Sequence, residues 1–161
     1  MKKNEKYYYM IIGIIITSIG YNVYSLIVVE SSYSFFKSVE NAKYSIDIAV
    51  FSFTNMELAK ALVEKSKEGV KIRVIVDRNS LDRKAVRYME KEGIEIRTYD
   101  GTMHAKVMIV DSKVIIGSHN YSYSAFGKNK ELSVMVNPLL ILKVAEIKQW
   151  FNEMWEKAKP I

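Results

Sequence analysis

The stretch Ser45–Asp77, SIDIAVFSFTNMELAKALVEKSKEGVKIRVIVD, decides the fold of this 161-residue chain. Residues Tyr44–Phe53 are rich in Ile, Val and Phe, which favours a strand. Residues 54–57 have the form of a capping box with Thr54 as the cap, and they predict a helix that ends near Gly69. Lys71–Asp77 then predicts a second strand. A strand, a helix and a strand in this order predict parallel pairing through a right-handed crossover.

The same alternation continues on both sides of this stretch. The further expected elements are a strand at 25–31, helices at 31–43 and 80–92, a strand at 94–99, a hairpin from 105–110 and 114–117, a strand at 131–136, and a last helix. That helix starts at Asn137-Pro138 and carries an apolar stripe formed by Leu140, Val144, Ile147, Phe151 and Met154. The sequence therefore predicts an α/β fold, with a mixed, mostly parallel sheet flanked by helices.

Length and composition narrow the class of protein. A chain of this length forms one domain with a single core. The absence of cysteine excludes disulfides, thiolate catalysis and cysteine-based zinc sites. The formal net charge of +6 points towards polyanions or anionic surfaces, and it equally fits a soluble domain that happens to be basic.

The N-terminal residues 1–24 predict a membrane anchor or a signal peptide. Lys2, Lys3 and Lys6 precede the uncharged residues 7–29, in which YYYMIIGIIITSIG is the most apolar part. A spanning helix needs about 20 residues, and the apolar region of a signal peptide about 7–15. We expect a hydrophobic N-terminal helix that anchors an extracytoplasmic domain, residues 25–161. A cleaved segment would instead give a secreted or periplasmic protein, and a buried N-terminal helix is the third interpretation.

Both histidines of the chain lie in HAKVMIVDSKVIIGSHN, residues 104–120. Side chains alternate along a strand, so His104 and Lys106 project from the same face. A neutral imidazole is a nucleophile for phosphorus and titrates near neutral pH, while lysine supplies charge to phosphoryl oxygens without a metal. Ser118 and Asn120 add neutral hydrogen-bond donors. This combination predicts chemistry on a phosphate.

The spacing His104-x-Lys106-x4-Asp111, followed by Gly117-Ser118-His119-Asn120, resembles the signature of the phospholipase D superfamily. It is most similar to the small single-motif endonuclease branch, over about residues 25–155, and the stretch 45–77 is also similar to that branch. The resemblance implies a phospholipase D-like fold and a phosphohistidine intermediate, with no metal or other cofactor. It makes His104 the nucleophile or acid and Lys106 a phosphate-binding residue. It implies that Ser118 and Asn120 orient the phosphate, that Glu131 steadies the histidine, and that Asp111 belongs to the catalytic signature.

The hairpin departs from that family by being one residue shorter between Asp111 and Gly117. A two-residue turn at Ser112-Lys113 would place His119, not Ser118, opposite Lys106. We therefore predict a three-residue loop or a bulge between Asp111 and Ser118, and a regular hairpin would instead favour His119. Asp111 itself is at odd spacing from His104 and begins a turn, where aspartate is common for local reasons, so a structural role is favoured.

One catalytic motif predicts two chains. In-line displacement at phosphorus puts the nucleophile and the leaving group on opposite sides, so one imidazole cannot serve both. His119 or His104 of another copy must supply the second acid. In the resembled family two motifs meet about a twofold axis, so we expect a C2 homodimer with a shared active site. The ligand sets of zinc hydrolases do not occur in this sequence.

Three functions fit these features. The first is an endonuclease for DNA or RNA, for which Arg83, Lys84, Arg87 and Lys91 could follow a phosphate backbone or simply form a solvated helix face. The alternative is a membrane-associated phospholipid hydrolase, favoured by the N-terminal segment. The last is a degenerate protein that binds nucleic acid or anionic lipid without cleaving it.

Overall fold

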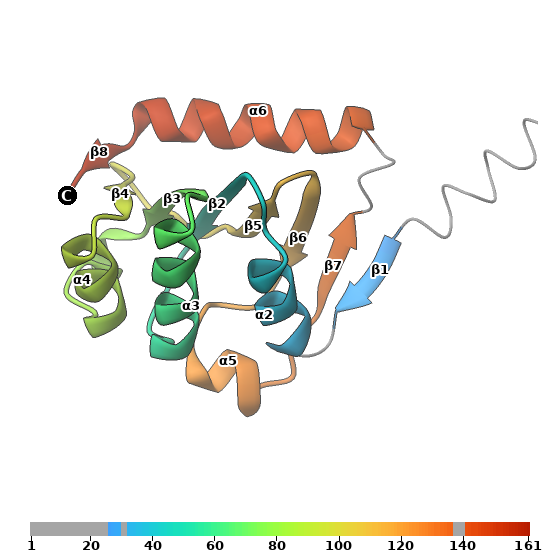
Figure 1. Cartoon of the computed structure of the whole chain (residues 1–161), viewed down its shortest axis with the longest axis horizontal. Helices are drawn as coiled ribbons and strands as arrows, with labels where there is room; N and C mark the ends of the chain where they lie inside the picture. The colour runs from blue at the N-terminus through green and yellow to red at the C-terminus, as the bar shows by residue number, and fades with distance from the viewer. Residues whose placement is uncertain (1–25, 30–31, 137–140) are drawn as a thin grey trace, which may run out of the picture.

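A computed structural model describes residues 26–29, 32–136 and 141–161 of the chain (Figure 1). The elements in order are β1 (Leu26–Val29), α2 (Ser32–Glu40), β2 (Ser45–Val50), α3 (Met56–Lys67), β3 (Lys71–Val76), the 3-10 turn η1 (Arg78–Ser80), α4 (Lys84–Lys91), β4 (Glu95–Thr98), β5 (Lys106–Val110), β6 (Lys113–Gly117), α5 (Tyr123–Gly127), β7 (Ser133–Val136), α6 (Ile141–Lys157) and β8 (Lys159–Pro160).

All the described strands belong to one sheet, in the order β1-β7-β6-β5-β2-β3-β4-β8. Only the pairs β2–β3 and β3–β4 are parallel, and every other pairing is antiparallel. The α/β class and the mixed sheet are confirmed, but the expectation of a mostly parallel sheet is wrong. Helices α3 and α4 are crossovers between parallel neighbours, whereas β5 and β6 are joined by a short turn and pair antiparallel.

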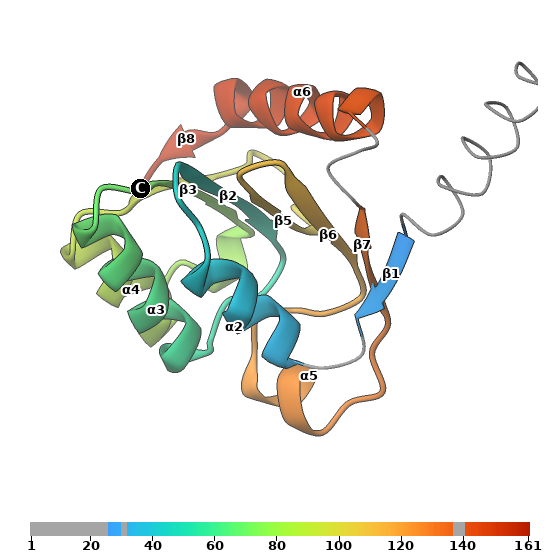
Figure 2. The same cartoon turned by 45° about the vertical axis from the view of Figure 1, so that its right-hand side comes forward.

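Helices cover both faces of the sheet, as Figures 1 and 2 show. Helices α2, α3, α4 and α5 lie on one face, and α6 crosses the other. Strand β2 is buried on both sides: Ile46 and Ile48 pack towards α2 and α3, and Ala49 packs in the cluster that contains Phe151 of α6. Both faces of the central strands are therefore core, which explains their nearly continuous apolar sequence.

Three local features differ from the sequence predictions. Helix α3 is capped by Asn55, whose Oδ1 accepts a hydrogen bond from the Leu58 amide at 2.8 Å, so the prediction of Thr54 as the cap is wrong. Thr54 instead donates its backbone N–H to the Tyr121 carbonyl, which holds it outside the helix. The expected helix at 80–92 begins only at Lys84, as α4, after the turn η1, and neither α5 nor β8 was expected.

Most of the apolar stripe predicted for the last helix lies in α6. Val144 and Phe151 of the α6 stripe are buried as expected. The helix start at Asn137-Pro138 and Leu140 lie outside the described residues. The membrane or signal segment, residues 1–24, also lies outside them and stays a prediction. Within 26–29, 32–136 and 141–161, no helix combines the length and apolar character needed to cross a membrane.

The topology brings three chain segments to one edge of the sheet. Strand β5 runs antiparallel to β2 with Val50 paired to Lys106, so β5 begins where β2 ends. Strand β3 is parallel to β2 and ends at the same edge. Carboxyl ends of parallel strands are a common place for ligand sites in open α/β sheets. The residues around His104 lie at this edge.

Candidate active site

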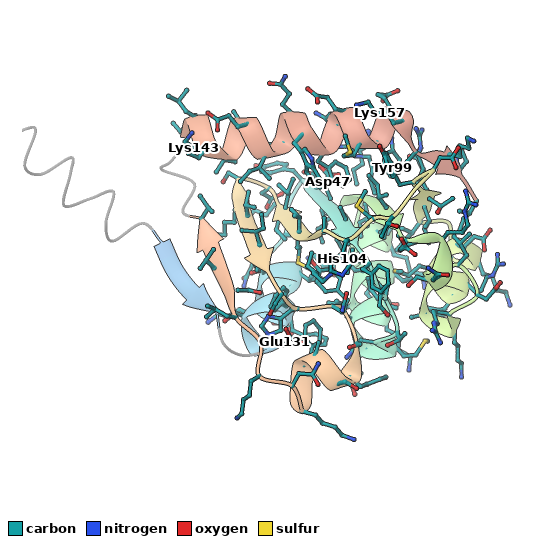
Figure 3. All side chains as sticks on the ribbon, turned by 180° about the vertical axis from the view of Figure 1, so that it is seen from behind. Asp47, Tyr99, His104, Glu131, Lys143 and Lys157 are labelled. Carbon is teal, nitrogen blue, oxygen red and sulfur yellow. The ribbon has the colours of Figure 1, made fainter. Side chains whose placement is uncertain are left out.

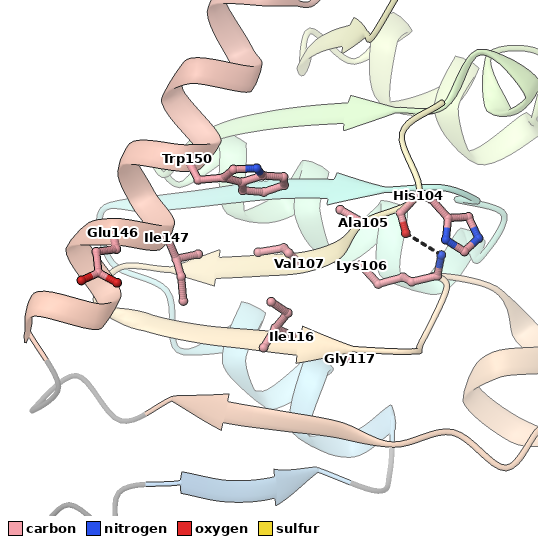
Figure 4. A pocket seen from close by; sticks show the side chains of 9 residues that line it. All are labelled: His104, Ala105, Lys106, Val107, Ile116, Gly117, Glu146, Ile147 and Trp150. Carbon is pink, nitrogen blue, oxygen red and sulfur yellow. Dashed lines mark hydrogen bonds between the residues drawn. The ribbon is translucent and has the colours of Figure 1, made fainter. Parts of the chain in front are cut away.

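His104 and Lys106 lie together at the start of β5. His104 is exposed, and Lys106 is partly buried. The Lys106 ammonium donates to the His104 carbonyl oxygen at 2.9 Å, and both side chains lie at the same end of the strand (Figure 4). Figure 3 shows the position of His104 in the whole molecule. Burial lowers the pKa of Lys106, while the negative charge of Glu131 acts in the opposite direction. The predicted imidazole and ammonium are therefore neighbours.

Phe51, the residue after β2, supports both groups. Its ring centroid lies 5.1 Å from the His104 ring centroid and 5.4 Å from Lys106 Nζ. Its backbone N–H donates to the Ala105 carbonyl at 3.1 Å. The second distance is within the range of a cation–π interaction. Sequence reasoning missed Phe51 because an aromatic residue at the end of an apolar strand is typical of a core residue.

Ser118 and Asn120 lie in the segment after β6, each held by a different neighbour. The Ser118 hydroxyl donates to the Glu131 carboxylate and accepts from the Leu132 amide at 3.1 Å. Asn120 Oδ1 accepts from the backbone N–H of Ser52 at 3.2 Å, one residue beyond Phe51. Asn120 is thus fixed beside the segment that supports His104.

Glu131 lies just before β7 and accepts a hydrogen bond from Ser118 in the segment after β6. Hydrogen bonds from Ser118 and Asn129 lower the pKa of the Glu131 carboxyl, and the positive charge of Lys106 adds to the shift. The carboxylate therefore holds Ser118 directly and acts on Lys106 through its charge.

His119 occupies a different environment from His104. Only 2% of it is exposed, its Nδ1 lies 2.7 Å from Ser133 Oγ, and its ring centroid lies 5.2 Å from that of Phe35. Burial lowers the pKa of His119, with the charge of Glu131 opposing that effect. A buried imidazole that tends to stay neutral is a core residue, unlike the exposed His104.

The β5–β6 hairpin is regular, so the predicted loop or bulge between Asp111 and Ser118 is wrong. The ladder runs from Val107–Ile116 to Val110–Lys113 and leaves a two-residue turn at Asp111-Ser112. Asp111, the first residue of this turn, has φ +53°, a left-handed value that aspartate tolerates. Strand alternation alone would now favour His119 for the site, but its burial against Phe35 opposes that choice.

Asp111 lies at the opposite end of β5 from His104. Seven residues of extended chain separate them by roughly 20 Å. Its carboxylate accepts the backbone N–H groups of Lys43, Tyr44 and Ser45 at 3.0, 2.8 and 3.0 Å. Partial burial acts to raise the pKa of Asp111, but these amide hydrogen bonds outweigh it and the pKa falls. The position agrees with the structural role favoured for Asp111.

An apolar pocket of about 400 Å³ adjoins the histidine and the lysine. It lies between α6 and the β5–β6 hairpin, with His104 and Lys106 at one end, Glu146 at the other and Trp150 between them (Figure 4). Ile116, Val107 and Ile147 form most of the wall between them. The sequence analysis assigned Ile147 to ordinary core and did not predict a pocket there.

One basic side chain of α4 is paired with acidic neighbours. Arg87 of α4 is paired with Asp82 at 2.9 Å and with Glu90 at 3.0 Å, so its charge is partly neutralised on the helix surface. In the part of the chain that the structure describes, no group of three or more His, Asp or Glu side chains could hold a metal ion.

The chain is similar in sequence to known proteins. Residues 35–155 match the family model described as cardiolipin synthase, PLD-like domain. The chain is 30% identical over 124 residues to a mitochondrial cardiolipin hydrolase of Xenopus laevis, covering 74% of this chain and 58% of that protein. It is 32% identical over 123 residues to a phospholipase D of Rickettsia prowazekii, covering 72% of this chain and 58% of that protein. The chain thus spans less than two thirds of either relative.

The fold also matches a solved structure of the same superfamily. Nuc from Salmonella typhimurium, a phospholipase D family member, superposes with a TM-score of 0.75 at 28% identity. The match covers 85% of this chain and 97% of that one. Together with the matched family model, this similarity identifies the chain as a member of the phospholipase D superfamily.

Proposed function

We propose that this chain is a phosphodiesterase that uses His104 as its nucleophile without a metal ion, and that its substrate is DNA or RNA. The observation that carries the proposal is the exposed His104 imidazole beside the Lys106 ammonium, both against the Phe51 ring. An anionic phosphate next to Lys106 would place its phosphorus within reach of an imidazole.

The chemistry takes two displacements at phosphorus. In the first, an imidazole nitrogen of His104 forms a bond to phosphorus while the bond to the leaving oxygen breaks, and a second imidazole protonates that oxygen. In the second, the same second imidazole removes a proton from water, and the water oxygen displaces His104. Lys106 balances charge on the phosphoryl oxygens, and we assign Ser118 and Asn120 to orienting them.

The second imidazole requires a partner. His119 is buried against Ser133 and Phe35, so it is unsuited to protonating a bound substrate. We therefore propose a C2 homodimer in which each subunit contributes His104 to one shared site. The buried state of His119 supports this choice.

Nucleic acid is the first candidate substrate. The net charge of +6 favours a polyanion, and the similarity to Nuc covers nearly the whole of that protein. Because Arg87 is ion-paired with Asp82 and Glu90, α4 offers less free positive charge for nucleic-acid binding than the sequence suggested.

Phospholipid is the second candidate, and the apolar pocket favours it. A phospholipid places a charged phosphate next to hydrocarbon, and the pocket places His104 and Lys106 next to Ile116 and Trp150. The relatives named cardiolipin hydrolase and phospholipase D support the same candidate. The predicted membrane segment, residues 1–24, would keep the site of an extracytoplasmic domain close to lipid.

Cleavage assays in EDTA test the proposal. The full chain and its His104→Ala variant are incubated separately with plasmid DNA, single-stranded RNA and anionic phospholipid vesicles. We expect the wild-type chain to cleave nucleic acid and the variant to lose this activity. Cleavage of lipid alone would select the second candidate. Binding without cleavage by the wild type would indicate a degenerate binding protein, and activity that survives in His104→Ala would contradict both enzymatic functions.

A further inference from the structure

The segment that carries His104 is irregular. Residues 99–105 join β4 to β5 and form neither helix nor strand. Its position therefore depends on hydrogen bonds to neighbouring elements. Both neighbours of His104 make one: the Ala105 carbonyl accepts from the Phe51 amide at 3.1 Å, and the Met103 amide donates to Asp77 Oδ2 at 2.9 Å. His104 is held between the ends of β2 and β3.

Asp77 is a buried carboxylate that the proposed mechanism does not use. It is the residue after β3, and only 2% of it is exposed. Its Oδ1 accepts the backbone N–H and the side-chain Nδ2 of Asn79 at 3.0 and 2.8 Å, which caps the turn η1. Its Oδ2 accepts the Met103 amide. The two oxygens therefore have separate tasks, one local and one directed at the histidine segment.

The capping task does not by itself require a carboxylate. Serine or asparagine can cap a turn with one oxygen. An asparagine here would have one oxygen and one NH2 group, and the NH2 would face either the Asn79 donors or the Met103 N–H. Only an acidic side chain satisfies both sets of donors at once.

We propose that Asp77 is a positioning residue for catalysis. Its carboxylate fixes the main chain at Met103 and thereby the position and orientation of the His104 imidazole. This inference rests on the proposed role of His104 as the nucleophile. The Met103 side chain is also buried, 4% exposed, so backbone and side chain hold this residue from two sides. His104, the next residue, then projects from a fixed point. In-line attack at phosphorus depends on such placement, because an error of about 1 Å can lower a rate by about 100-fold.

The test compares Asp77→Asn with a matched control, Asp47→Asn. Asp47 is also a buried carboxylate, 7% exposed, but it accepts two hydrogen bonds from Arg73 and has no bond to residues 99–105. Both variants of the full chain should lose stability. We expect Asp77→Asn to lower kcat per folded molecule by about 10- to 100-fold with little change in KM. Asp47→Asn should keep kcat within about twofold, because Asp47 has no hydrogen bond to the segment that carries His104.

Histidine NMR gives a readout that does not depend on activity. The chain has two histidines, and His119, held by Ser133, serves as the internal reference. We expect Asp77→Asn to shift or broaden the His104 ring resonances and leave those of His119 in place, and Asp47→Asn to move neither set. If Asp77→Asn does not fold, Asp77→Glu, which keeps both oxygens, is measured in the same way and should move only the His104 signals.

The outcomes separate this inference from the proposed function. A wild-type chain without EDTA-resistant cleavage would contradict the function, and the NMR comparison would still decide whether Asp77 positions His104. A folded Asp77→Asn protein with unchanged kcat, or with unchanged His104 resonances, would overturn the role of Asp77.

Discussion

At the scale of single residues, Asp111 belongs to the family signature, but its hydrogen bonds are to the backbone and it lies far from His104. Its carboxylate accepts backbone N–H groups from Lys43 and Tyr44, just before β2, and from Ser45, the first residue of β2, and so links the start of β2 to the β5–β6 turn. No part of this cluster approaches His104, which lies at the other end of β5. We therefore assign the proposed chemistry to the first residues of the signature, and hairpin geometry to its last residue.

Substituting Asp111→Asn should lower stability and leave the chemistry intact. Asparagine tolerates the positive φ but offers one acceptor oxygen, so the variant should lose about 2 kcal/mol of unfolding free energy at pH 7. The folded state lowers the pKa of Asp111, so its stabilisation is present above the unfolded pKa of about 3.9 and is lost as pH falls through the folded value. Urea unfolding of both proteins at pH 7 and pH 3 should show a gap that narrows in acid.

The activity of the same variant provides the control. Turnover per folded molecule should equal that of the wild type. A folded Asp111→Asn protein without activity would mean that this carboxylate acts in catalysis, in spite of its distance from His104.

At the scale of elements, Gly117 permits the close approach of β6 to β7. A Cβ atom at this position would overlap the Leu132 carbonyl oxygen, the Ser133 hydroxyl and the Ser133 Cα. Because backbone atoms are among these neighbours, relief would require β7 to move. The same Ser133 hydroxyl contacts His119. The hydrogen-bonded residues Ser118 and Glu131 lie next to this contact, one just after β6 and the other just before β7.

Gly117→Ala should therefore destabilise the fold by about 1–3 kcal/mol and displace Ser133 from the His119 ring. Thermal unfolding and the His119 ring resonances measure the two effects. The matched control is Gly127→Ala at the end of α5, where a Cβ would meet no atom within 4 Å. Equal unfolding temperatures for the two variants would contradict the close-contact explanation.

The sequence predicted many of the elements but not how the strands pair. Apolar runs and the glycines at 69 and 93 located strands and helix ends, because these signals are local. Parallel or antiparallel pairing depends on partners distant in sequence, so the sheet was expected to be mostly parallel. Likewise, His104 and Lys106 were found from their spacing, whereas Phe51 and Asp77 reach them only through the adjacent ends of β2, β3 and β5.

At the scale of the whole molecule, one chain presents one exposed imidazole. The other histidine is buried in the core beside α2 and α5, and Phe35 and Phe126 lie near its ring. We therefore propose that a second subunit supplies the imidazole that protonates the leaving oxygen. The proposed homodimer follows from this chemistry together with the position of His104 at the sheet edge.

Activity of mixed dimers in EDTA is the most direct measurement of this shared site. Wild-type and His104→Ala chains are mixed, allowed to exchange subunits, and assayed on the substrate that the wild type cleaves. Since a shared site needs both imidazoles, a 1:1 mixture should show activity per wild-type chain that falls to about half of the unmixed value. Activity that stays proportional to the amount of wild-type chain, or that disappears when divalent ions are removed, would contradict a metal-independent site built from two copies of His104.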